Sequence, residues 1–539
     1  DKMELGKIYH MGREEKADLI LNRQAMASHT FVTGSTGTGK SNAVYHLLDE
    51  ITKDGRTSFL VVEPAKGEYK NVFGSRADVK VFGTNPRETP LLRINPFAFP
   101  QDIHILEHID RLVEIFNACW PMYAAMPAVL KDAIERSYQK VGWDLRNSES
   151  EKGVFPTFFD LLDILPGVIE ESHYSKDTQS DYVGALCTRV KSLTNGIYGS
   201  VFCAEDALSD AELFDCNVVV DLSRVGSMET KSLLMGILVM KLQEYRMCGS
   251  EMNSRLRHVT VLEEAHNLLR KTSAEQPQEG ANLQGKSVEM LANAIAEMRT
   301  YGEGFIIADQ APGLLDMSVI RNTNTKIILR LPDEEDRKMV GKSAALKEAQ
   351  IDELSKLPLG VAAVYQNEWP EAVLCKIEAY PMPENAVYHK PSKMPHEINA
   401  EFVFGQLAAG KELEPLGISE MEQLKLWLKR HEMMLKPEDG RYLEQVFAGG
   451  ELDVAKTRKA VFDFFGGIST VVDYCAAAEK SFTPRKEFLE QLQGQYGLKA
   501  AAADWVLNSV ISMGMSLNPD AKAVDNLRTN FEQQGGRVL

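Results

Sequence analysis

The sequence lacks several features that would place it outside the cytoplasm. No apolar run approaches the roughly 18 residues that a membrane-spanning helix needs, and the first residues show no secretory pattern of basic, apolar and small residues. The seven cysteines are odd in number and never form a Cys-x-x-Cys pair, which favours reduced thiols over disulfides or a zinc site. We therefore expect a soluble, cytoplasmic protein.

Positive charge is also scarce. The chain has 60 Lys and Arg residues against 77 Asp and Glu residues, so its formal net charge is −17. This balance argues against a surface coated for nucleic-acid binding, because phosphate contacts need clustered cations. It leaves room for a ring, in which only a narrow lumen must be basic. Net charge alone therefore does not decide the partner.

The chain has 539 residues, which is more than one hydrophobic core usually serves, so about two to four domains are expected. Short runs rich in Val and Ile alternate with helical stretches in two regions, a pattern typical of a parallel sheet that is buried on both faces. The runs are residues 29–33, 58–63 and 79–83 in the first region, and 217–222, 259–263, 305–309, 326–331 and 361–365 in the second. This predicts an α/β fold.

The segment between these two regions and the segment after them are predicted to be helical. Residues 102–210 contain amphipathic stretches at 103–118, 128–139 and 158–169, and we predict a helical insertion between a first core part (29–101) and a second (211–380). A Pro-rich stretch from 381 to 395 then opens a helical C-terminal region, 381–539, with amphipathic stretches at 420–436 and 454–465. That region shows no catalytic constellation and is interpreted as a packing or protein-contact domain.

Residues 34–41, Gly-Ser-Thr-Gly-Thr-Gly-Lys-Ser, match the phosphate-binding loop G-x-x-x-x-G-K-[ST] between a predicted strand and a predicted helix. Glycines let backbone N–H groups point at the phosphates, and the start of the helix adds its positive end. Lys40 is expected to reach the β- and γ-phosphates and the Ser41 hydroxyl to ligate Mg²⁺. The alternative is a chance match in a Gly-rich turn. The predicted nucleotide-binding residues are Gly34, Ser35, Thr36, Gly37, Thr38, Gly39, Lys40, Ser41 and Asn42.

A second predicted strand ends in the acidic pair Glu263 and Glu264. A P-loop enzyme needs one acid at this point to hold Mg²⁺ and another to polarise the attacking water. We assign the metal to Glu263, together with Ser41, and the role of general base to Glu264. The alternative is an exposed acidic strand end.

Three further positions are candidate catalytic residues because strand ends are where open α/β sheets place their sites. Glu63 could orient water or Mg²⁺ and Gln310 could sense the γ-phosphate, although either could merely cap its strand. Arg299 precedes the strand at 305–309 and could stabilise the transition state of a neighbouring subunit. It could also be a helix-end arginine favoured by the dipole, and Arg330 is a competing candidate.

With these residues assembled, the chain resembles the HerA branch of the HerA/FtsK ATPases. The matching stretches cover roughly residues 5 to 380. They are residues 34–42 (the P-loop and Asn42), 64–69 (PAKGEY), 94–97 (INPF), 262–269 (LEEAHNLL), 299–302 (RTYG) and 306–310 (IIADQ). Three departures stand out. Glu63 and Glu263 both carry Glu where the family commonly has Asp. The family's small N-terminal barrel is expected to be missing, because only residues 1–28 precede the first predicted core strand, and residues 381–539 have no matching counterpart.

The resemblance implies a RecA-like core, a homohexameric ring and ATP hydrolysis between neighbouring subunits. It also implies movement of duplex DNA through the lumen and a partner nuclease or effector, in DNA end processing or in anti-phage defence. Lys40, Ser41, Glu263 and Glu264 match the family's phosphate, magnesium and acidic positions, and Arg299 resembles its trans arginine. Residues 1–28 are expected to be a lead-in, the remnant of an N-terminal domain that the resemblance implies.

Two other functions remain open from the sequence. One is an ATP-dependent scaffold that assembles or regulates an effector enzyme with little translocation, which the unmatched C-terminal region suggests. The other is a conjugation-type coupling ATPase, which loses weight because no membrane anchor is seen. We find no nuclease cluster in the chain and expect any cutting activity in a partner.

Overall fold

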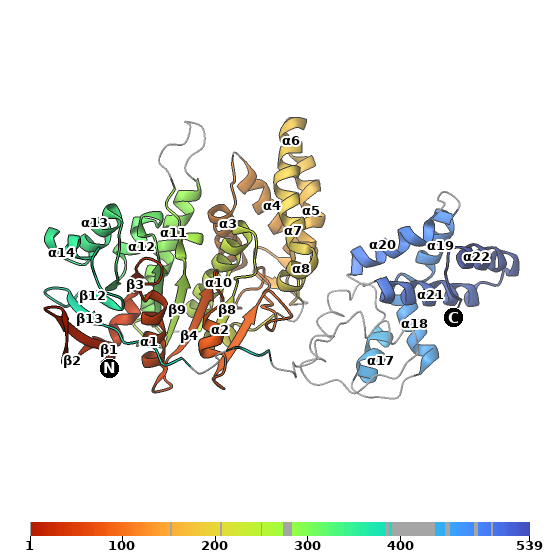
Figure 1. The fold of residues 1–539 in the computed structure, drawn as a ribbon. Coiled ribbons are helices and arrows are strands. Elements are labelled where there is room, and N and C mark those ends of the chain that lie inside the picture. Colours follow the sequence, from red (N-terminus) through yellow and green to blue (C-terminus); the bar gives the residue numbers. More distant parts are fainter. Residues whose placement is uncertain are drawn as a thin grey trace. The chain divides into compact units, whose positions relative to one another are not determined.

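The computed structural model describes residues 2–123, 125–150, 153–204, 207–249, 251–272, 283–382, 387–390, 437–447, 453–478, 483–496 and 500–538. The chain divides into two compact units, Asp1–Lys390 and Pro391–Leu539. The first contains an eleven-stranded sheet with helices, and the described part of the second is helical (Figure 1). Most of the Pro-rich stretch at 381–395 and the predicted helix at 420–436 lie outside the described residues.

Seven parallel strands make up one side of the sheet, up to its edge at β5, in the order β11-β3-β10-β9-β4-β8-β5. Their bounds are β3 Thr30–Thr33, β4 Ser58–Glu63, β5 Val79–Gly83, β8 Asn217–Asp221, β9 His258–Glu263, β10 Glu303–Asp309 and β11 Thr325–Ile328. Strands such as β9 and β10 are buried along their whole length, as expected for strands covered on both faces. The predicted α/β fold with a RecA-like core is confirmed.

The predicted run at 326–331 is too long, because the strand ends at Ile328. Beyond this point the chain turns to the P-loop: the backbone N–H and the hydroxyl of Ser35 both donate to the carbonyl of Arg330, at 3.0 and 3.1 Å. The chain after β11 thus stays apolar but anchors the phosphate-binding loop instead of continuing the sheet.

Four antiparallel strands extend the sheet beyond β11 in the order β2-β1-β13-β12. They are β1 Lys2–His10, β2 Arg13–Asn22, β12 Val361–Gln366 and β13 Val373–Lys376. Only β12 was predicted from the sequence. The β1–β2 hairpin turns at Met11 and Gly12, which have φ values of 46° and 77°, the pair of positive angles that a tight hairpin turn requires. Residues 2–22 are therefore part of the central sheet.

Helices cover both faces of the sheet (Figure 1). One face packs against α1 (Lys40–Thr52) and α2 (Tyr69–Phe73), and the other against α3 (Ile105–Cys119), α10 (Met228–Gly249) and α11 (Leu283–Glu297). The remaining elements of the unit are α4 (Met126–Lys140), β6 (Trp143–Asp144), β7 (Glu149–Ser150), α5 (Phe158–Glu171), α6 (Lys176–Tyr182), α7 (Thr188–Thr194), α8 (Gly196–Phe202), α9 (Asp210–Phe214), α12 (Met317–Arg321), α13 (Glu334–Ser343) and α14 (Glu348–Glu353).

The helices predicted at 103–118, 128–139 and 158–169 are present as α3, α4 and α5. Their buried side chains, such as Leu112, Leu130 and Leu161, belong to the same hydrophobic cluster as Leu60 and Val62 of β4. The helical segment between the two core parts therefore shares its core with one face of the sheet.

The C-terminal unit has its own hydrophobic core. Its described helices are α17 (Pro437–Phe447), α18 (Val454–Phe464), α19 (Gly467–Ala478), α20 (Pro484–Tyr496), α21 (Ala500–Leu517) and α22 (Ala521–Gln533), and α18 confirms the helix predicted at 454–465. Across the described residues no single helix has the length and apolar character to span a bilayer, although the bent pair α18 and α19 meets that test together.

Candidate active site

The P-loop joins the end of β3 to the start of α1. Gly37 and Gly39 have φ values of 76° and 108°, which side chains rarely allow. A Cβ on Gly34 would lie 2.8 Å from Leu329 Cβ, so the loop also needs glycine for its close approach to the chain after β11. Thr38 is buried and its hydroxyl donates to the carbonyl of Ser35 at 2.7 Å. These contacts fix a curved backbone around the start of α1.

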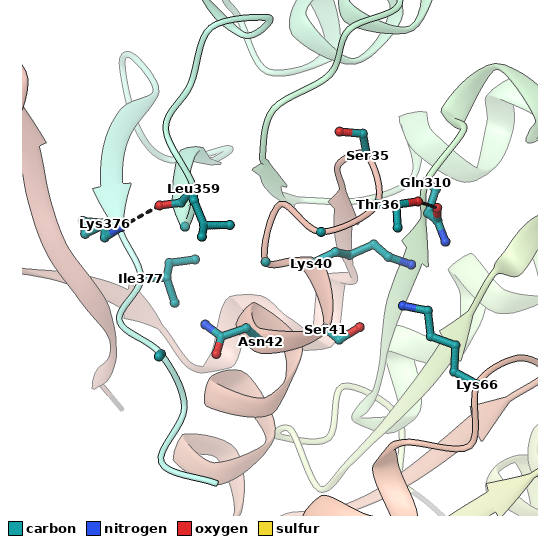
Figure 2. A pocket seen from close by; sticks show the side chains of 14 residues that line it. Ser35, Thr36, Lys40, Ser41, Asn42, Lys66, Gln310, Leu359, Lys376 and Ile377 are labelled. Carbon is teal, nitrogen blue, oxygen red and sulfur yellow. Dashed lines mark hydrogen bonds between the residues drawn. The ribbon is translucent and has the colours of Figure 1, made fainter.

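A cavity of about 400 Å³ opens above this loop (Figure 2). Eight of the predicted site residues line it: Ser35, Thr36, Gly37, Gly39, Lys40, Ser41, Asn42 and Gln310. The other lining residues are Lys66, Leu359, Gly360, Lys376, Ile377 and Ala379. The carboxyl ends of β3 and β10 and the segments around β12 and β13 thus meet at this cavity, whereas Glu263 and Glu264 do not line it.

The acidic pair after β9 binds the P-loop lysine directly. Lys40 Nζ lies 2.8 Å from Glu263 Oε2 and 3.1 Å from Glu264 Oε1. The other oxygen of Glu263 accepts a hydrogen bond of 2.5 Å from the Tyr69 hydroxyl. Burial lowers the pKa of Lys40, but the two carboxylates raise it more, so the net pKa lies above its ordinary value. The predicted acidic pair therefore forms a buried ion-pair cluster with Lys40.

Glu264 is held from three sides. Besides Lys40, Gln310 Nε2 donates to its Oε1 at 2.5 Å, and His266 Nδ1 lies 3.6 Å from its Oε2. Gln310 in turn accepts a hydrogen bond of 2.6 Å from the Thr36 hydroxyl. The backbone of Glu264 has φ 45°, a conformation that costs free energy in a non-glycine residue and tends to occur at functional sites. Gln310 thus bridges the P-loop and the candidate general base.

His266 is fixed by Asp309 at the end of β10. Both its backbone N–H and its Nδ1 lie within 2.9 Å of Asp309 Oδ2, and this hydrogen bond raises the pKa of His266. Glu264, His266 and Asp309 could together hold a metal ion by their geometry, but the hydrogen bonds among them already explain their grouping.

Glu63 is buried at the end of β4 and does not line the cavity. Its carboxylate accepts the backbone N–H groups of Glu68 and Tyr69 at 2.8 and 3.1 Å. Burial raises the pKa of Glu63 to about 8, against the effect of these two hydrogen bonds. The carboxylate therefore shapes the loop between β4 and α2, while a role with water or Mg²⁺ stays a prediction.

The two candidate arginines lie at opposite ends of the parallel strands. Arg299 belongs to the short helical turn Met298–Tyr301 before the start of β10, and it is exposed. The structure therefore places it away from the cavity of its own chain. Arg330 follows β11 beside the P-loop and is also exposed. A role across a subunit interface stays a prediction for Arg299.

Comparisons with known proteins find similar helicases and ATPases. A family model described as "Helicase HerA, central domain" matches residues 3–152. The chain is 25% identical over 386 residues to the DNA double-strand break repair helicase HerA of Sulfolobus acidocaldarius, covering 70% of this chain and 69% of the relative. The chain is therefore similar to the HerA helicases. The resemblance to the HerA branch is thereby confirmed.

Further similarities extend over the ATPase unit of this HerA-like chain. A probable helicase of Methanocaldococcus jannaschii, MJECL08, is 23% identical over 390 residues, which are 67% of this chain and 68% of the relative. VirB4 of Thermoanaerobacter pseudethanolicus has a similar fold, with a TM-score of 0.52 at 18% identity over 70% of this chain and 97% of that one. The plasmid coupling protein TrwB, solved with an ATP analogue, has a TM-score of 0.51 at 15% identity over 72% of this chain and 97% of that one.

The sequence did not reveal the other wall of the HerA-like cavity. This wall is formed by residues 377–380 after β13, which we call the strap. Both atoms of the Asn42 side-chain amide bind it: Nδ2 donates to the carbonyl of Glu378 at 2.8 Å, and Oδ1 accepts the N–H of Tyr380 at 2.7 Å. His46 Nε2 lies 3.0 Å from the same Glu378 carbonyl. The predicted nucleotide-binding residue Asn42 therefore fastens this wall to the P-loop helix.

The residues predicted to hold Mg²⁺ fit that ion. The Ser41 hydroxyl lines the cavity at the start of α1, and Glu263 supplies a carboxylate at the end of β9. Mg²⁺ prefers oxygen ligands and keeps several waters, so the longer side chain of Glu can bind it through water. Each carboxylate oxygen of Glu263 already accepts one hydrogen bond and retains a further lone pair for such a water.

Proposed function

We propose that this chain hydrolyses ATP with Mg²⁺ to move duplex DNA, as a homohexameric ring that supplies DNA to a partner nuclease or effector. The observation that carries the proposal is the convergence of Lys40, Glu263, Glu264 and Gln310 at the carboxyl ends of β3, β9 and β10. The HerA helicases to which the chain is similar are described as acting in DNA double-strand break repair. DNA end processing and anti-phage defence are both roles that such a motor supports.

Each side chain has a distinct task in this proposal. Lys40 neutralises the β- and γ-phosphates, and Glu264 accepts the proton of the attacking water. Gln310 orients Glu264 and reports on the P-loop through Thr36. Mg²⁺, held by Ser41 and Glu263, would supply further positive charge to the phosphates. A triphosphate would replace the two glutamates as the partner of Lys40, which frees Glu264 for catalysis.

The ring and the cellular location rest on weaker support. Arg299 is exposed and precedes the start of β10, at the end of the strands opposite to the P-loop, which suits a residue that completes a neighbour's site. Cys119, Cys187, Cys216, Cys248 and Cys375 are free thiols, which suits a reducing cytoplasm.

ATP turnover with and without linear duplex DNA tests the motor, with light scattering to report the mass of the assembly. Turnover stimulated by DNA in a ring, and lost in Lys40→Ala, is the expected result. Lys342→Ala is a matched control, because Lys342 is an exposed lysine on α13 that does not line the cavity. A nucleotide-bound ring that ignores several forms of DNA would contradict the motor.

A second candidate function is an ATP-dependent scaffold for an effector enzyme. The observation that favours it is the C-terminal unit, a helical body with a hydrophobic core of its own. Glu264→Gln separates the two functions, because it removes the general base and leaves the phosphate-binding loop intact. Effector assembly that survives in this variant would favour the scaffold, and its loss together with hydrolysis would favour the motor.

A further inference from the structure

Lys66 has an unusual backbone conformation beside the candidate active site. Its φ is 67°, and that of the following Gly67 is 70°. Left-handed angles of this kind are costly for a side chain other than glycine, and they persist only where the surroundings impose them. Such backbone strain beside a cavity often accompanies a function.

The surroundings hold this loop firmly. The Glu63 carboxylate accepts hydrogen bonds from the backbone N–H groups of Glu68 and Tyr69. The N–H of Gly67 donates to the carbonyl of Ala65 at 2.8 Å. A Cβ on Gly67 would lie 3.0 Å from Ser223 Oγ and 3.2 Å from Asp221 Oδ2. Buried contacts on both sides of Lys66 thus fix the direction in which its side chain leaves the backbone.

That direction is into the cavity. Figure 2 shows the Lys66 side chain rising from its loop toward Ser41 and Lys40, on the side of Lys40 opposite to Leu359 and Ile377. Lys40 also ends on this side, where it meets the acidic pair. Lys66 therefore faces the end of the cavity at which the phosphates would be cleaved.

Lys66 differs from the other two lysines of the cavity in its partners. Lys40 is bound by Glu263 and Glu264, and Lys376 donates to the carbonyl of Leu359. Within the described ranges Lys66 has no hydrogen bond or ion pair. Two ammonium groups directed into one cavity repel each other unless an anion lies between them, and charge-assisted hydrogen bonds to phosphate oxygens are strong.

We propose that Lys66 is a second phosphate-binding lysine, which contacts the terminal phosphate of ATP and stabilises the charge that develops on it during hydrolysis. This inference rests on the proposed function of the cavity as an ATPase site. It adds a catalytic residue from the loop after β4, supplied by the same chain as the P-loop. The strained backbone of Lys66 is then the cost of directing its ammonium group at the reacting phosphate.

Nucleotide binding at equilibrium tests the inference. Lys66→Ala and Lys66→Arg are made in the Glu264→Gln background, so that ATP is not consumed, and ATP and ADP are titrated separately with Mg²⁺ by calorimetry. A lost charge-assisted hydrogen bond predicts that Lys66→Ala weakens ATP about 10- to 100-fold. ADP affinity should change by less than about twofold, because ADP lacks the terminal phosphate. Lys66→Arg should recover most of the ATP affinity.

A second variant separates charge from backbone shape. Glycine tolerates the left-handed conformation, so Lys66→Gly keeps the loop while it removes the ammonium group. It should lose ATP affinity as Lys66→Ala does, and with Glu264 restored both should have a lower kcat. Lys342→Ala is again the control.

Several outcomes would overturn the inference. These are an equal loss of ATP and ADP affinity, unchanged affinity for both, or wild-type behaviour of Lys66→Gly. The proposed motor function fails separately: a chain whose turnover ignores DNA, but whose ATP affinity depends selectively on Lys66, would refute the motor and leave Lys66 as a phosphate-binding residue.

Discussion

The substitution Gln310→Glu tests how the candidate general base is held. The new side chain keeps an oxygen to accept the Thr36 hydroxyl, but it replaces the amide donor that lies 2.5 Å from Glu264 Oε1 with a second carboxylate oxygen. A hydrogen bond to a charged group contributes about 1.5–3 kcal/mol, which corresponds to about a 10- to 100-fold effect. Two adjacent carboxylates also share a proton to a higher pH than one alone.

We therefore expect kcat for ATP hydrolysis at neutral pH to fall about 10- to 100-fold in Gln310→Glu. The acid limb of the pH–rate profile should move to higher pH, because the second carboxylate that the substitution introduces favours a proton shared between the two side chains. Steady-state turnover at saturating ATP, measured across the pH range, gives both quantities.

Gln310→Leu is the matched control, because it removes the donor without adding charge. It should lower kcat while moving the acid limb much less than Gln310→Glu. A Gln310→Glu variant with the turnover and pH profile of the wild-type chain would refute the reasoning, because it would show that the bond to Glu264 does not persist in the working enzyme.

Two further predictions concern the strap and the core. Asn42→Leu removes both hydrogen bonds to the strap and should raise KM for ATP about 10-fold or more with little change in kcat; an unchanged KM would contradict a role of the strap in binding. Lys326 is buried on β11, where burial lowers its pKa from 10.5 to about 8, a penalty of about 3 kcal/mol below pH 8. Lys326→Met should thus raise the free energy of unfolding at pH 7 by about 1–2 kcal/mol, because the lost hydrogen bond to the carbonyl of Thr323 offsets part of the gain. Between pH 8 and 10.5 the unfolded chain binds one more proton at Lys326 than the folded chain does, so the free energy of unfolding of the wild-type protein rises with pH in this range. The difference in this free energy between wild type and Lys326→Met should therefore shrink as the pH rises. Thermal unfolding at several pH values measures it.

The parallel strands were predictable because each is a short run buried on both faces. The prediction for β10 began two residues late, at Phe305, because the strand opens with a buried Glu303. This carboxylate is paired with Arg246 at 3.0 Å and with His258 at 2.7 Å. In the sequence, a charged residue such as Glu303 suggests a loop. Its burial is explained only by its partners Arg246 and His258, which are distant in the sequence.

The missed hairpin of β1 and β2 had a weak signal. Its inward side chains alternate with exposed polar ones, as Met3 and Leu5 do with Lys2 and Glu4 in β1, but most of the hairpin is solvent-facing. Short alternations of this kind are common in loops and do not stand out from the sequence alone.

The residues of the candidate site also fall into a predictable group and an unpredictable one. Lys40, Ser41, Glu264 and Gln310 follow strands within recognisable motifs, so their convergence could be predicted. The strap and Gly360 could not, because they reach the cavity only after β12 and β13 pair in antiparallel register. No local pattern reports a contact such as that between Asn42 and Tyr380, which are separated by 338 residues.

The strap also limits how far the first unit, Asp1–Lys390, can be truncated from its C-terminal end. Further along the chain, the N–H of Tyr388 donates to Asn71 Oδ1 at 2.9 Å, and the unit ends at Lys390. A shortened protein that stops at residue 376 would keep all eleven strands and yet lose one wall of the nucleotide cavity. The smallest fragment suitable for expression or crystallisation therefore runs through Lys390, and the chain that leads to the C-terminal unit starts as part of the nucleotide site.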